Sequence, residues 1–205
     1  MQIILDGAGK KYNKEWIFRG LSKSVSSGNP LAVTGPNGSG KSTLMLIIAG
    51  WTLPNAGSVA YISDNKTLPA DEWYKKIDFI APYTELVEEL TLSEFLTFHF
   101  SFKPISGSLG INDIIQKSHL EGNEHKFVKH FSSGMKQRLK LALGLYSASP
   151  VLLLDEPTTN LDQLNKNWYM EEIEAVLRNK LVIIASNQPE EYTFASEFIQ
   201  IENYK

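Results

Sequence analysis

The sequence predicts an α/β protein whose main sheet is mostly parallel, with an antiparallel β part at the N-terminus and a small helical part in the middle. Three apolar runs support the parallel sheet. Leu31–Thr34 is a short strand-type segment that leads through a glycine-rich turn into an apolar run of helical length. Val151–Leu154 and Leu181–Ala185 are continuously apolar, which is typical of strands that helices cover on both faces.

Composition limits the classes of protein that the chain fits. Its 205 residues, of which 42% are hydrophobic, suffice for one domain, or for one domain with a modest subdomain. The formal net charge of −3 gives no support to nucleic-acid binding, and the absence of cysteine excludes disulfides and thiolate metal sites. Met1–Asp6 lacks the features of a signal peptide, and no uncharged apolar run reaches the roughly 18–20 residues that span a bilayer. We therefore expect a soluble, cytoplasmic protein.

The glycine-rich turn fits the pattern of glycine, four residues, glycine, lysine, and serine or threonine, which cradles phosphate groups. Its nine residues are Gly35, Pro36, Asn37, Gly38, Ser39, Gly40, Lys41, Ser42 and Thr43. The glycines allow backbone N–H groups to point at an anion, and the following helix start adds its positive dipole end. Lys41 supplies a charge for the β- and γ-phosphates, and the Ser42 hydroxyl suits Mg²⁺. A plain glycine turn is the alternative, which the complete pattern and its strand–helix context disfavour, so we predict binding of a nucleoside triphosphate.

Short antiparallel strands are expected before this loop, at Met1–Leu5 and within Trp16–Val25, followed by the turn residues of Ser26–Pro30. Tyr12 falls in the loop between these strands. Its ring could stack on a purine base or be an ordinary surface tyrosine, and the local sequence favours neither interpretation.

The elements after the phosphate loop follow from turn residues and alternation. Gly50 is expected to end the first helix. The next elements are a strand at Ser58–Ile62, a short helix at Asp71–Lys76, and a strand at Ile77–Ala81 that Pro82 stops.

Helices are predicted from Thr84 onward. Thr91-Leu92-Ser93-Glu94 is a capping box that opens a helix ending near Phe102. Most of its phenylalanines are expected in the core, while some could present an apolar patch to a partner; they are Phe95, Phe98, Phe100 and Phe102. A second short helix is expected at Ile111–Ser118.

Phe131–Arg138 introduces a further helix through small residues. Ser132 and its neighbours offer a hydroxyl and free N–H groups at the helix start. This arrangement fits either a second contact with an anion or an ordinary serine N-cap, and the stretch alone favours the N-cap.

Asp155 and Glu156 directly follow a buried strand. An acid at the carboxyl end of such a strand, in a phosphate-loop protein, is where a carboxylate that organises Mg²⁺ belongs. A second carboxylate beside it can orient or polarise a water molecule. Two solvated charges are the alternative, which the ordered-looking turn Thr158–Asp162 disfavours. A helix at Gln163–Arg178 and a closing strand at Phe198–Glu202 complete the expected elements.

The order of these motifs resembles the nucleotide-binding ATPase subunit of ATP-binding-cassette (ABC) transporters over essentially the whole chain. Each motif is a partial signal, but their order and spacing together are very specific. The resemblance implies a P-loop NTPase (RecA-like) core at about 31–83 and 148–205, an antiparallel β subdomain at about 1–30, and a small α-helical subdomain at about 84–147.

The resemblance also implies roles for single residues in binding ATP and Mg²⁺. Tyr12 would stack on adenine, and Asn37–Thr43 would hold the phosphates. Ser42 would ligate Mg²⁺, and Asp155 would act on the ion mainly through water. Glu156 would be the general base or the carboxylate that orients the attacking water.

A further set of implied roles concerns a second subunit. Phe-Ser-Ser-Gly-Met resembles the family's signature sequence, so Ser132 and the Gly134 amide would meet the γ-phosphate of ATP held by the opposite subunit. Ser133 and Met135 depart from the usual residues but leave the hydroxyl and the later glycine in place. Asp162 resembles the acid of the loop that joins the two sites across the dimer.

Two departures from the family pattern bear on the reaction. Tyr83 stands where the family usually has a glutamine that contacts Mg²⁺ and water, and a phenol cannot replace a neutral amide carbonyl; Glu85 is a candidate substitute. Asn187 stands where the family has a switch histidine, and it can contact a γ-phosphate oxygen only without charge. Losing one such contact costs on the order of 2–4 kcal/mol, so we expect slow hydrolysis.

The predicted function is therefore an ATPase that dimerises around ATP and Mg²⁺, as a homodimer or a heterodimer, and drives a separate transmembrane permease on the inner face of the membrane. The motion would pass through Tyr83 and the aromatic helix. The alternative is a non-transport ATP switch acting on protein or nucleic-acid complexes, whose relatives carry insertions or second cassettes that 205 residues cannot contain. A small-molecule kinase or a GTPase is disfavoured because no Asn-Lys-x-Asp motif is present.

Overall fold

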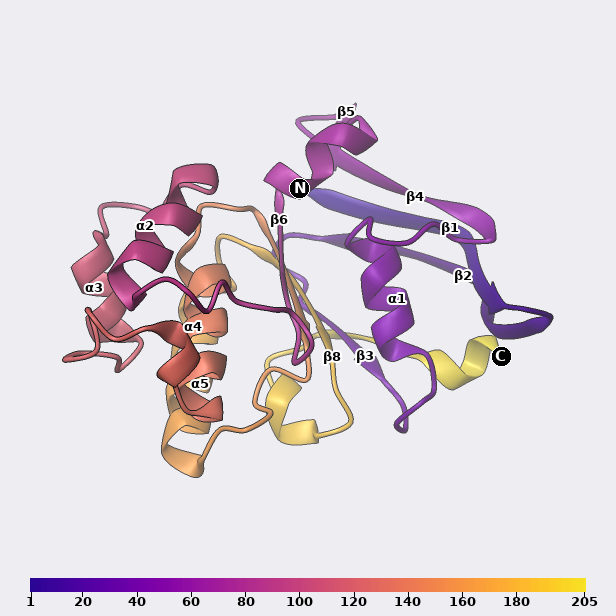
Figure 1. Cartoon of the computed structure of the whole chain (residues 1–205). Coiled ribbons are helices and arrows are strands. Elements are labelled where there is room, and N and C mark those ends of the chain that lie inside the picture. Colours follow the sequence, from indigo (N-terminus) through magenta and orange to yellow (C-terminus); the bar gives the residue numbers. More distant parts are fainter.

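The computed structural model describes all 205 residues and contains two β-sheets with helices packed around them (Figure 1). The larger sheet has five strands, all parallel, in the order β6-β7-β8-β3-β9. Its strands are β3 (Leu31–Thr34), β6 (Ile77–Ile80), β7 (Val151–Asp155), β8 (Leu181–Ala185) and β9 (Glu197–Gln200). The predicted α/β fold of a P-loop NTPase is confirmed.

The second sheet is antiparallel, with the strand order β2-β1-β4-β5. Its strands are β1 (Gln2–Tyr12), β2 (Glu15–Ser26), β4 (Ala56–Ser63) and β5 (Lys66–Thr67). Tyr12 is the last residue of β1 rather than a loop residue, so that expectation was wrong. Asn13 has a φ of 54°, so a two-residue turn joins the strands directly and Tyr12 pairs with Glu15.

Strand β4 also differs from the expected division of the chain. It follows helix α1 (Lys41–Ile48) and lies in the range assigned to the parallel core. It pairs instead with β1, with Gln2 opposite Ile62. Gly57 permits this close approach, because a Cβ there would lie 2.3 Å from the Asp6 carbonyl oxygen. The antiparallel sheet therefore takes strands from both sides of the phosphate loop.

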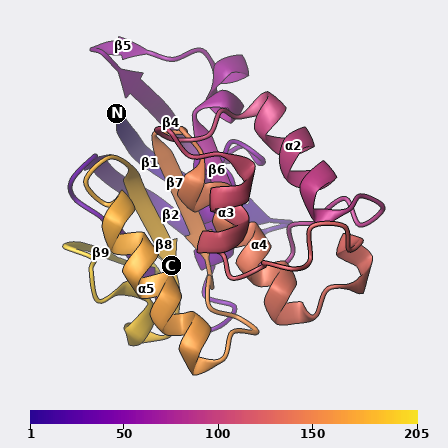
Figure 2. The same cartoon turned by 90° about the vertical axis from the view of Figure 1, so that its left-hand side faces the viewer.

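Alternate residues of the parallel sheet face two separate hydrophobic cores. In β7, Leu152 and Leu154 belong to the core beneath the larger helices, whereas Val151 and Leu153 belong to the core shared with α1 and the antiparallel sheet. The first core also contains residues of α2 (Leu92–Phe102), α3 (Ile111–Lys117), α4 (Ser133–Tyr146) and α5 (Gln163–Val176), helices that face the viewer in Figure 2. Burial on both faces explains why these strands are continuously apolar.

Helix α2 begins as predicted, because its capping box is formed. Its aromatic residues divide more evenly than expected. Phe95 and Phe100 are buried, whereas Phe98 and Phe102 are 49% and 71% exposed. Two phenylalanines on the outer face of α2 therefore remain for contacts outside this chain.

The C-terminal end corrects a further expectation, because the last strand stops at Gln200 and Ile201–Tyr204 forms a 3₁₀ turn. Ile201 is fully buried, and a Cβ on Gly35 would lie 3.0 Å from it, so this turn packs against the phosphate loop. The other 3₁₀ turns are Ala70–Lys75, Val128–His130 and Pro189–Tyr192. No helix in the structure has the length and apolar character required to cross a membrane.

Candidate functional site

The glycine-rich loop lies at the carboxyl end of β3 and leads directly into α1, as predicted. Gly35 and Gly40 have φ values of 144° and 111°, in a region that other residues rarely adopt. Space is also restricted. A Cβ on Gly40 would lie 2.5 Å from Ile17, and a Cβ on Gly35 would lie 2.8 Å from the Ser39 hydroxyl. Both backbone conformation and packing therefore require glycine here.

Lys41 is the first residue of α1 and is only 4% exposed. Its ammonium group donates hydrogen bonds to the carbonyls of Gly35 and Pro36 at 2.9 and 3.1 Å. A cavity of about 200 Å³ opens at the loop. Its lining residues are Ile17, Asn37, Gly38, Gly40, Lys41, Ser42, Thr43 and Glu156. The structure thus brings Glu156 to the same cavity as the loop, which suits an anionic ligand.

Asp155 is the last residue of β7 and is 1% exposed. Its Oδ2 accepts a hydrogen bond from the Tyr83 hydroxyl at 3.0 Å, and its Oδ1 is buried without a partner. Burial raises the pKa of Asp155, while the nearby hydroxyls of Ser42 and Tyr83 act in the opposite direction. A buried carboxylate oxygen without a partner, beside a serine hydroxyl, belongs to the donor set that Mg²⁺ prefers. Ser42 and Asp155 therefore fit this ion.

Tyr83 links this carboxylate to a row of aromatic rings. Burial and the charge of Asp155 raise the pKa of the Tyr83 phenol, so its hydroxyl remains a donor at neutral pH. The Tyr83 ring lies 6.2 Å from the ring of Phe79, which in turn lies 5.2 Å from the ring of Trp51. Trp51 is 62% exposed, so the row extends from Asp155 to the protein surface.

Glu156 has a φ of 46°, the left-handed conformation that costs an L-residue roughly 1–2 kcal/mol. Its amide donates to the Ala185 carbonyl at 2.9 Å, which attaches this residue to the end of β8. Strained backbone of this kind is found at functional positions. Glu156 adopts this conformation where it lines the cavity at the phosphate loop.

Asn187 is exposed two residues beyond the end of β8. Its side-chain amide donates to the Asn37 side-chain carbonyl at 2.9 Å. Asn187 therefore contacts the phosphate loop directly, while its assignment to the switch-histidine position stays a prediction.

The residues expected to serve a second nucleotide do not line the loop cavity. Ser132 caps α4 and accepts a hydrogen bond from the Met135 amide at 3.2 Å, so the N-cap interpretation is confirmed. Asp162 caps α5 in the same way, and hydrogen bonds from Asn165 hold the pKa of Asp162 below its usual value. Gly134 lies in the first turn of α4. The roles of these residues towards a nucleotide stay predictions.

Tyr12 is likewise absent from the lining of the loop cavity. Its ring is 50% exposed, and the Lys10 ammonium lies 5.4 Å from the ring centroid. Ile17, on the neighbouring strand β2, lines the cavity instead. No pattern in the sequence distinguished Ile17 from an ordinary strand residue.

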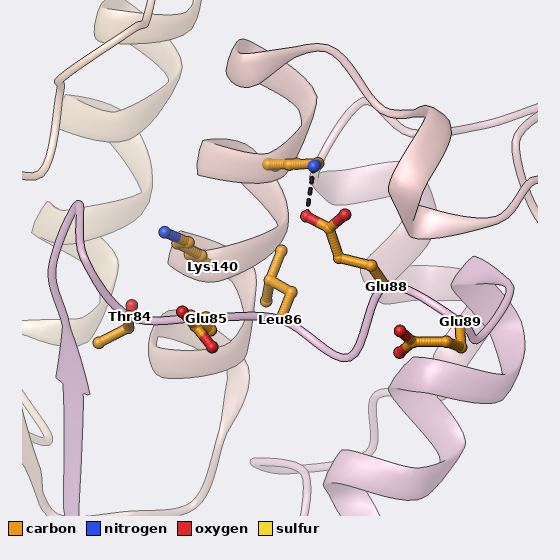
Figure 3. A pocket seen from close by; sticks show the side chains of 7 residues that line it. Thr84, Glu85, Leu86, Glu88, Glu89 and Lys140 are labelled. Atoms are coloured by element: carbon orange, nitrogen blue, oxygen red, sulfur yellow. Dashed lines mark hydrogen bonds and ion pairs between the residues drawn. The ribbon is translucent and has the colours of Figure 1, made fainter.

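A separate cavity of about 500 Å³ lies between the segment after β6 and helix α4 (Figure 3). Its lining is mostly charged and comprises Thr84, Glu85, Leu86, Glu88, Glu89, Lys136 and Lys140. Glu88 and Lys136 form an ion pair across it at 2.5 Å. Glu85 lies here and not at the loop cavity, and its role as a substitute for the family's glutamine stays a prediction.

Sequence reasoning missed two buried polar residues beside the Asp155–Glu156 turn. Gln137 lies on α4 and is 3% exposed, and Glu191 lies in the 3₁₀ turn Pro189–Tyr192 and is 2% exposed. Polar residues on a helix normally face solvent. Their sequence context therefore gave no signal of burial.

Known proteins share both the sequence and the fold. A family model described as ABC transporter matches residues 18–159. The chain is 33% identical to a cytochrome c biogenesis ATP-binding export protein of Brucella abortus (strain 2308), covering 91% of this chain and 85% of that protein. It is 31% identical to a Nod factor export ATP-binding protein of Rhizobium sp. (strain N33), covering 92% of this chain and 64% of that protein.

The fold is similar to that of a dimeric ATP-binding cassette solved in a post-hydrolysis state with ADP and Pi. The TM-score is 0.82 at 24% sequence identity, over 98% of this chain and 95% of that one. The two sequence relatives serve different systems at similar identity. What they share with this chain is the ATP-binding cassette.

Proposed function

Because the chain belongs to the ABC transporter family of ATP-binding proteins, we propose that it is the ATP-hydrolysing subunit of a transport system and that it drives a separate membrane-spanning permease. One observation carries the proposal. The loop Gly35–Thr43 and Glu156 share one cavity, Asn187 contacts the loop, and Asp155 lies beside Ser42. These residues come from three separate parts of the chain, and each has a part in phosphoryl transfer.

ATP is the proposed ligand of the loop, whose N–H groups and Lys41 would hold the β- and γ-phosphates. Ser42 and Asp155 would hold Mg²⁺, which polarises the phosphate oxygens when it is bound. Glu156 would accept a hydrogen bond from the attacking water and orient it towards the γ-phosphate. Tyr12 would stack on the adenine ring from the end of β1.

Turnover is expected to be slow because of Tyr83 and Asn187. The Tyr83 hydroxyl donates to Asp155, whereas a glutamine carbonyl would accept or ligate. The Asn187 amide is neutral and is engaged with Asn37. Neither residue supplies the charged or metal-ligating group usual in the family.

A head-to-tail dimer is the proposed active form, either of two identical chains or of this chain with another cassette. Ser132 and Asp162 are exposed at the starts of α4 and α5, and neither reaches the cavity of its own chain. In the dimer, Ser132 and Gly134 would meet the γ-phosphate bound by the opposite loop. Asp162 would lie at the contact between the two sites.

The permease is proposed to dock beside helix α2, on the inner face of the membrane. An apolar cavity of about 310 Å³ there is lined partly by Trp51, Phe79, Val87 and Phe98. Trp51 and Phe98 are largely exposed, and Phe102 extends the same apolar surface. A permease segment with an apolar face would cover these rings.

Phosphate release from ATP by the purified chain tests the enzymatic part of the proposal. The Glu156→Gln variant should lose at least about 100-fold in kcat, because an oriented base contributes roughly that much. Glu174→Gln, at an exposed position of α5, is the matched control and should keep the parent rate. Equal rates in Glu156→Gln and the parent would contradict the role of Glu156, and failure of the parent to bind ATP would contradict the proposal itself.

A further inference from the structure

The turn that follows Glu156 is held by two buried side chains from other parts of the fold. Gln137 is 3% exposed, and its Nε2 donates to the Pro157 carbonyl at 2.6 Å. Glu191 is 2% exposed, and its Oε1 accepts a hydrogen bond from the Thr158 amide at 3.1 Å. The same Oε1 also accepts from the Thr158 hydroxyl.

The two contacts meet at a single peptide group. The Pro157 carbonyl and the Thr158 amide are the two ends of the peptide unit between these residues. In a trans peptide unit they point in opposite directions, so Gln137 and Glu191 hold it from opposite sides. Rotation of this unit would break both contacts. The orientation of the peptide unit between Pro157 and Thr158, one residue beyond Glu156, is therefore fixed.

Burying the polar side chains of Gln137 and Glu191 costs free energy unless hydrogen bonds compensate for the lost contacts with water. An uncompensated buried carboxylate is strongly unfavourable. Glu191 Oε2 is buried without a partner, so the two hydrogen bonds from Thr158 to Oε1 are the ones that stabilise this carboxylate. Glu156 itself has a φ of 46°, a strained conformation that persists only where the surroundings enforce it. The Glu156 amide is bonded to Ala185 on its other side. The Glu156 carbonyl accepts a hydrogen bond from the Thr159 amide at 3.2 Å, so hydrogen bonds hold the chain on both sides of the strained residue.

The origins of the two side chains connect this turn to the parts of the chain that meet the γ-phosphate. Gln137 lies on α4, just over one helical turn after Ser132, the residue proposed to contact the nucleotide of the opposite subunit. Glu191 follows Asn187, which contacts the loop, by four residues. Displacement of α4 or of the segment after β8 would therefore move the peptide unit between Pro157 and Thr158.

We propose that Gln137 and Glu191 are positioning residues for Glu156, which set its orientation and make it depend on the positions of α4 and of the segment after β8. This inference rests on the proposed ATPase function. It concerns how the site is regulated by its own subunit contacts, whereas ATP binding at the loop does not depend on it.

Steady-state ATP hydrolysis separates positioning from binding. Gln137→Leu keeps the size of the side chain but removes the donor. It should lower kcat by about 10- to 100-fold, as a misplacement of about 1 Å does, and leave KM and the Kd for ATP within about twofold. Glu191→Leu should behave likewise, whereas Glu191→Gln keeps the acceptor oxygen and should retain most of the parent kcat. Gln116→Leu on α3 and Glu190→Leu beside Glu191 change exposed residues and are the controls.

Two further measurements show whether the effect passes through Glu156. In a Glu156→Gln background, adding Gln137→Leu should change the residual rate by less than about twofold, because coupled residues are not additive. Hydrogen exchange of the amides of Glu156 and Thr158–Leu161 should become faster in Gln137→Leu. The amides of residues 35 and 37–43 should be unchanged, and the melting temperature should stay within a few degrees of the parent.

Each outcome decides the inference. The inference is overturned if Gln137→Leu keeps the parent kcat. It is also overturned if the variant raises KM and Kd together with a loss of kcat, or if it reduces the rate by the same factor in the parent and in the Glu156→Gln background. If the parent shows no hydrolysis, the proposed function fails. Hydrogen exchange at the amides of Glu156 and Thr158–Leu161 then decides alone whether Gln137 and Glu191 hold the turn. Unchanged exchange in both leucine variants would overturn the inference.

Discussion

Asn187 shows how one side chain limits what the site can do. Its amide is engaged with Asn37, whereas a histidine at this position can carry charge and exchange protons near neutral pH. Asn187→His should therefore raise kcat by roughly tenfold, within the several hundredfold that one transition-state contact supplies. Initial rates at saturating ATP measure this, with the exposed Asn179→His as control. An unchanged kcat would mean that the site has already adapted to asparagine.

Tyr83 is the second residue whose chemistry can be tested singly. Its hydroxyl occupies Asp155 Oδ2, an oxygen that could otherwise act on the metal or its waters. Tyr83→Gln should lower the Mg²⁺ concentration for half-maximal ATP binding by roughly tenfold, the smaller end of what outer contacts contribute to metal affinity. Titration of nucleotide binding with Mg²⁺ measures this. Tyr74→Gln, at a position 65% exposed, should leave the titration unchanged.

If Tyr83→Gln required the same or more Mg²⁺ than the parent, the hydroxyl contact would be a support for Asp155 rather than a restriction on it.

The motifs of the site could be predicted because they are local: the loop is nine consecutive residues, and Asp155 and Glu156 adjoin one apolar strand. The contact between Tyr83 and Asp155 joins residues 72 positions apart. No local pattern contains it.

At the scale of the elements, a buried polar network joins the starts of β6 and β8 to the end of α4. The Lys180 ammonium donates to the carbonyls of Gly144 and Ser147, both at 2.7 Å. The Ser147 hydroxyl donates to Asp78, which also pairs with Lys103 at 2.7 Å. Lysine beside the last carbonyls of a helix is stabilising. This network therefore anchors the carboxyl end of α4 to the sheet.

The network predicts a pH dependence of stability. Burial lowers the pKa of Lys180 to about 8; Asp78 opposes this shift and Lys103 adds to it. The unfolded chain then binds more protons than the folded one between pH 8 and about 10, so stability rises with pH in that range. The free energy of unfolding should increase by about 1–2 kcal/mol from pH 8 to pH 9.5. Urea titrations measure this increase, which should be largely lost in Lys180→Met and persist in the exposed Lys66→Met; Lys140, whose pKa burial also lowers, accounts for the remainder.

Loss of the increase in both lysine variants, or in neither, would assign the pH dependence to other groups.

The sequence predicted most elements of this fold well, including the strand Leu181–Ala185 and the capped start of α2, because turn residues and alternation are local signals. It did not predict that β4 pairs with β1, or which of the phenylalanines of α2 are the exposed ones, namely Phe98 and Phe102. Strand partners and the covered face of a helix depend on distant segments, which propensity does not describe.

At the scale of the molecule, the proposed dimer makes a prediction about mass. Glu156→Gln should bind ATP without hydrolysing it, and the complex should therefore persist as a dimer in light scattering. Adding Ser132→Arg should return the mass to that of one chain, because a bulky cation would replace the hydroxyl at the proposed contact. Ser108→Arg, at an exposed site outside the proposed contact, is the control.

A monomer in Glu156→Gln with ATP and Mg²⁺ would contradict self-association and point to a different cassette as the partner. A dimer that survives Ser132→Arg would contradict the assigned contact. ATP affinity of the monomer should be similar in both arginine variants, since neither position lines the loop cavity.

The alternation of β7 residues between two cores has a consequence for folding. Leu152 and Leu153 are neighbours in the chain, yet each completes the packing of a different half of the protein. A slip of one residue in strand pairing would exchange the linings of both halves at once. Correct registration of this single five-residue strand therefore commits both halves together, so they should form and melt as one cooperative unit.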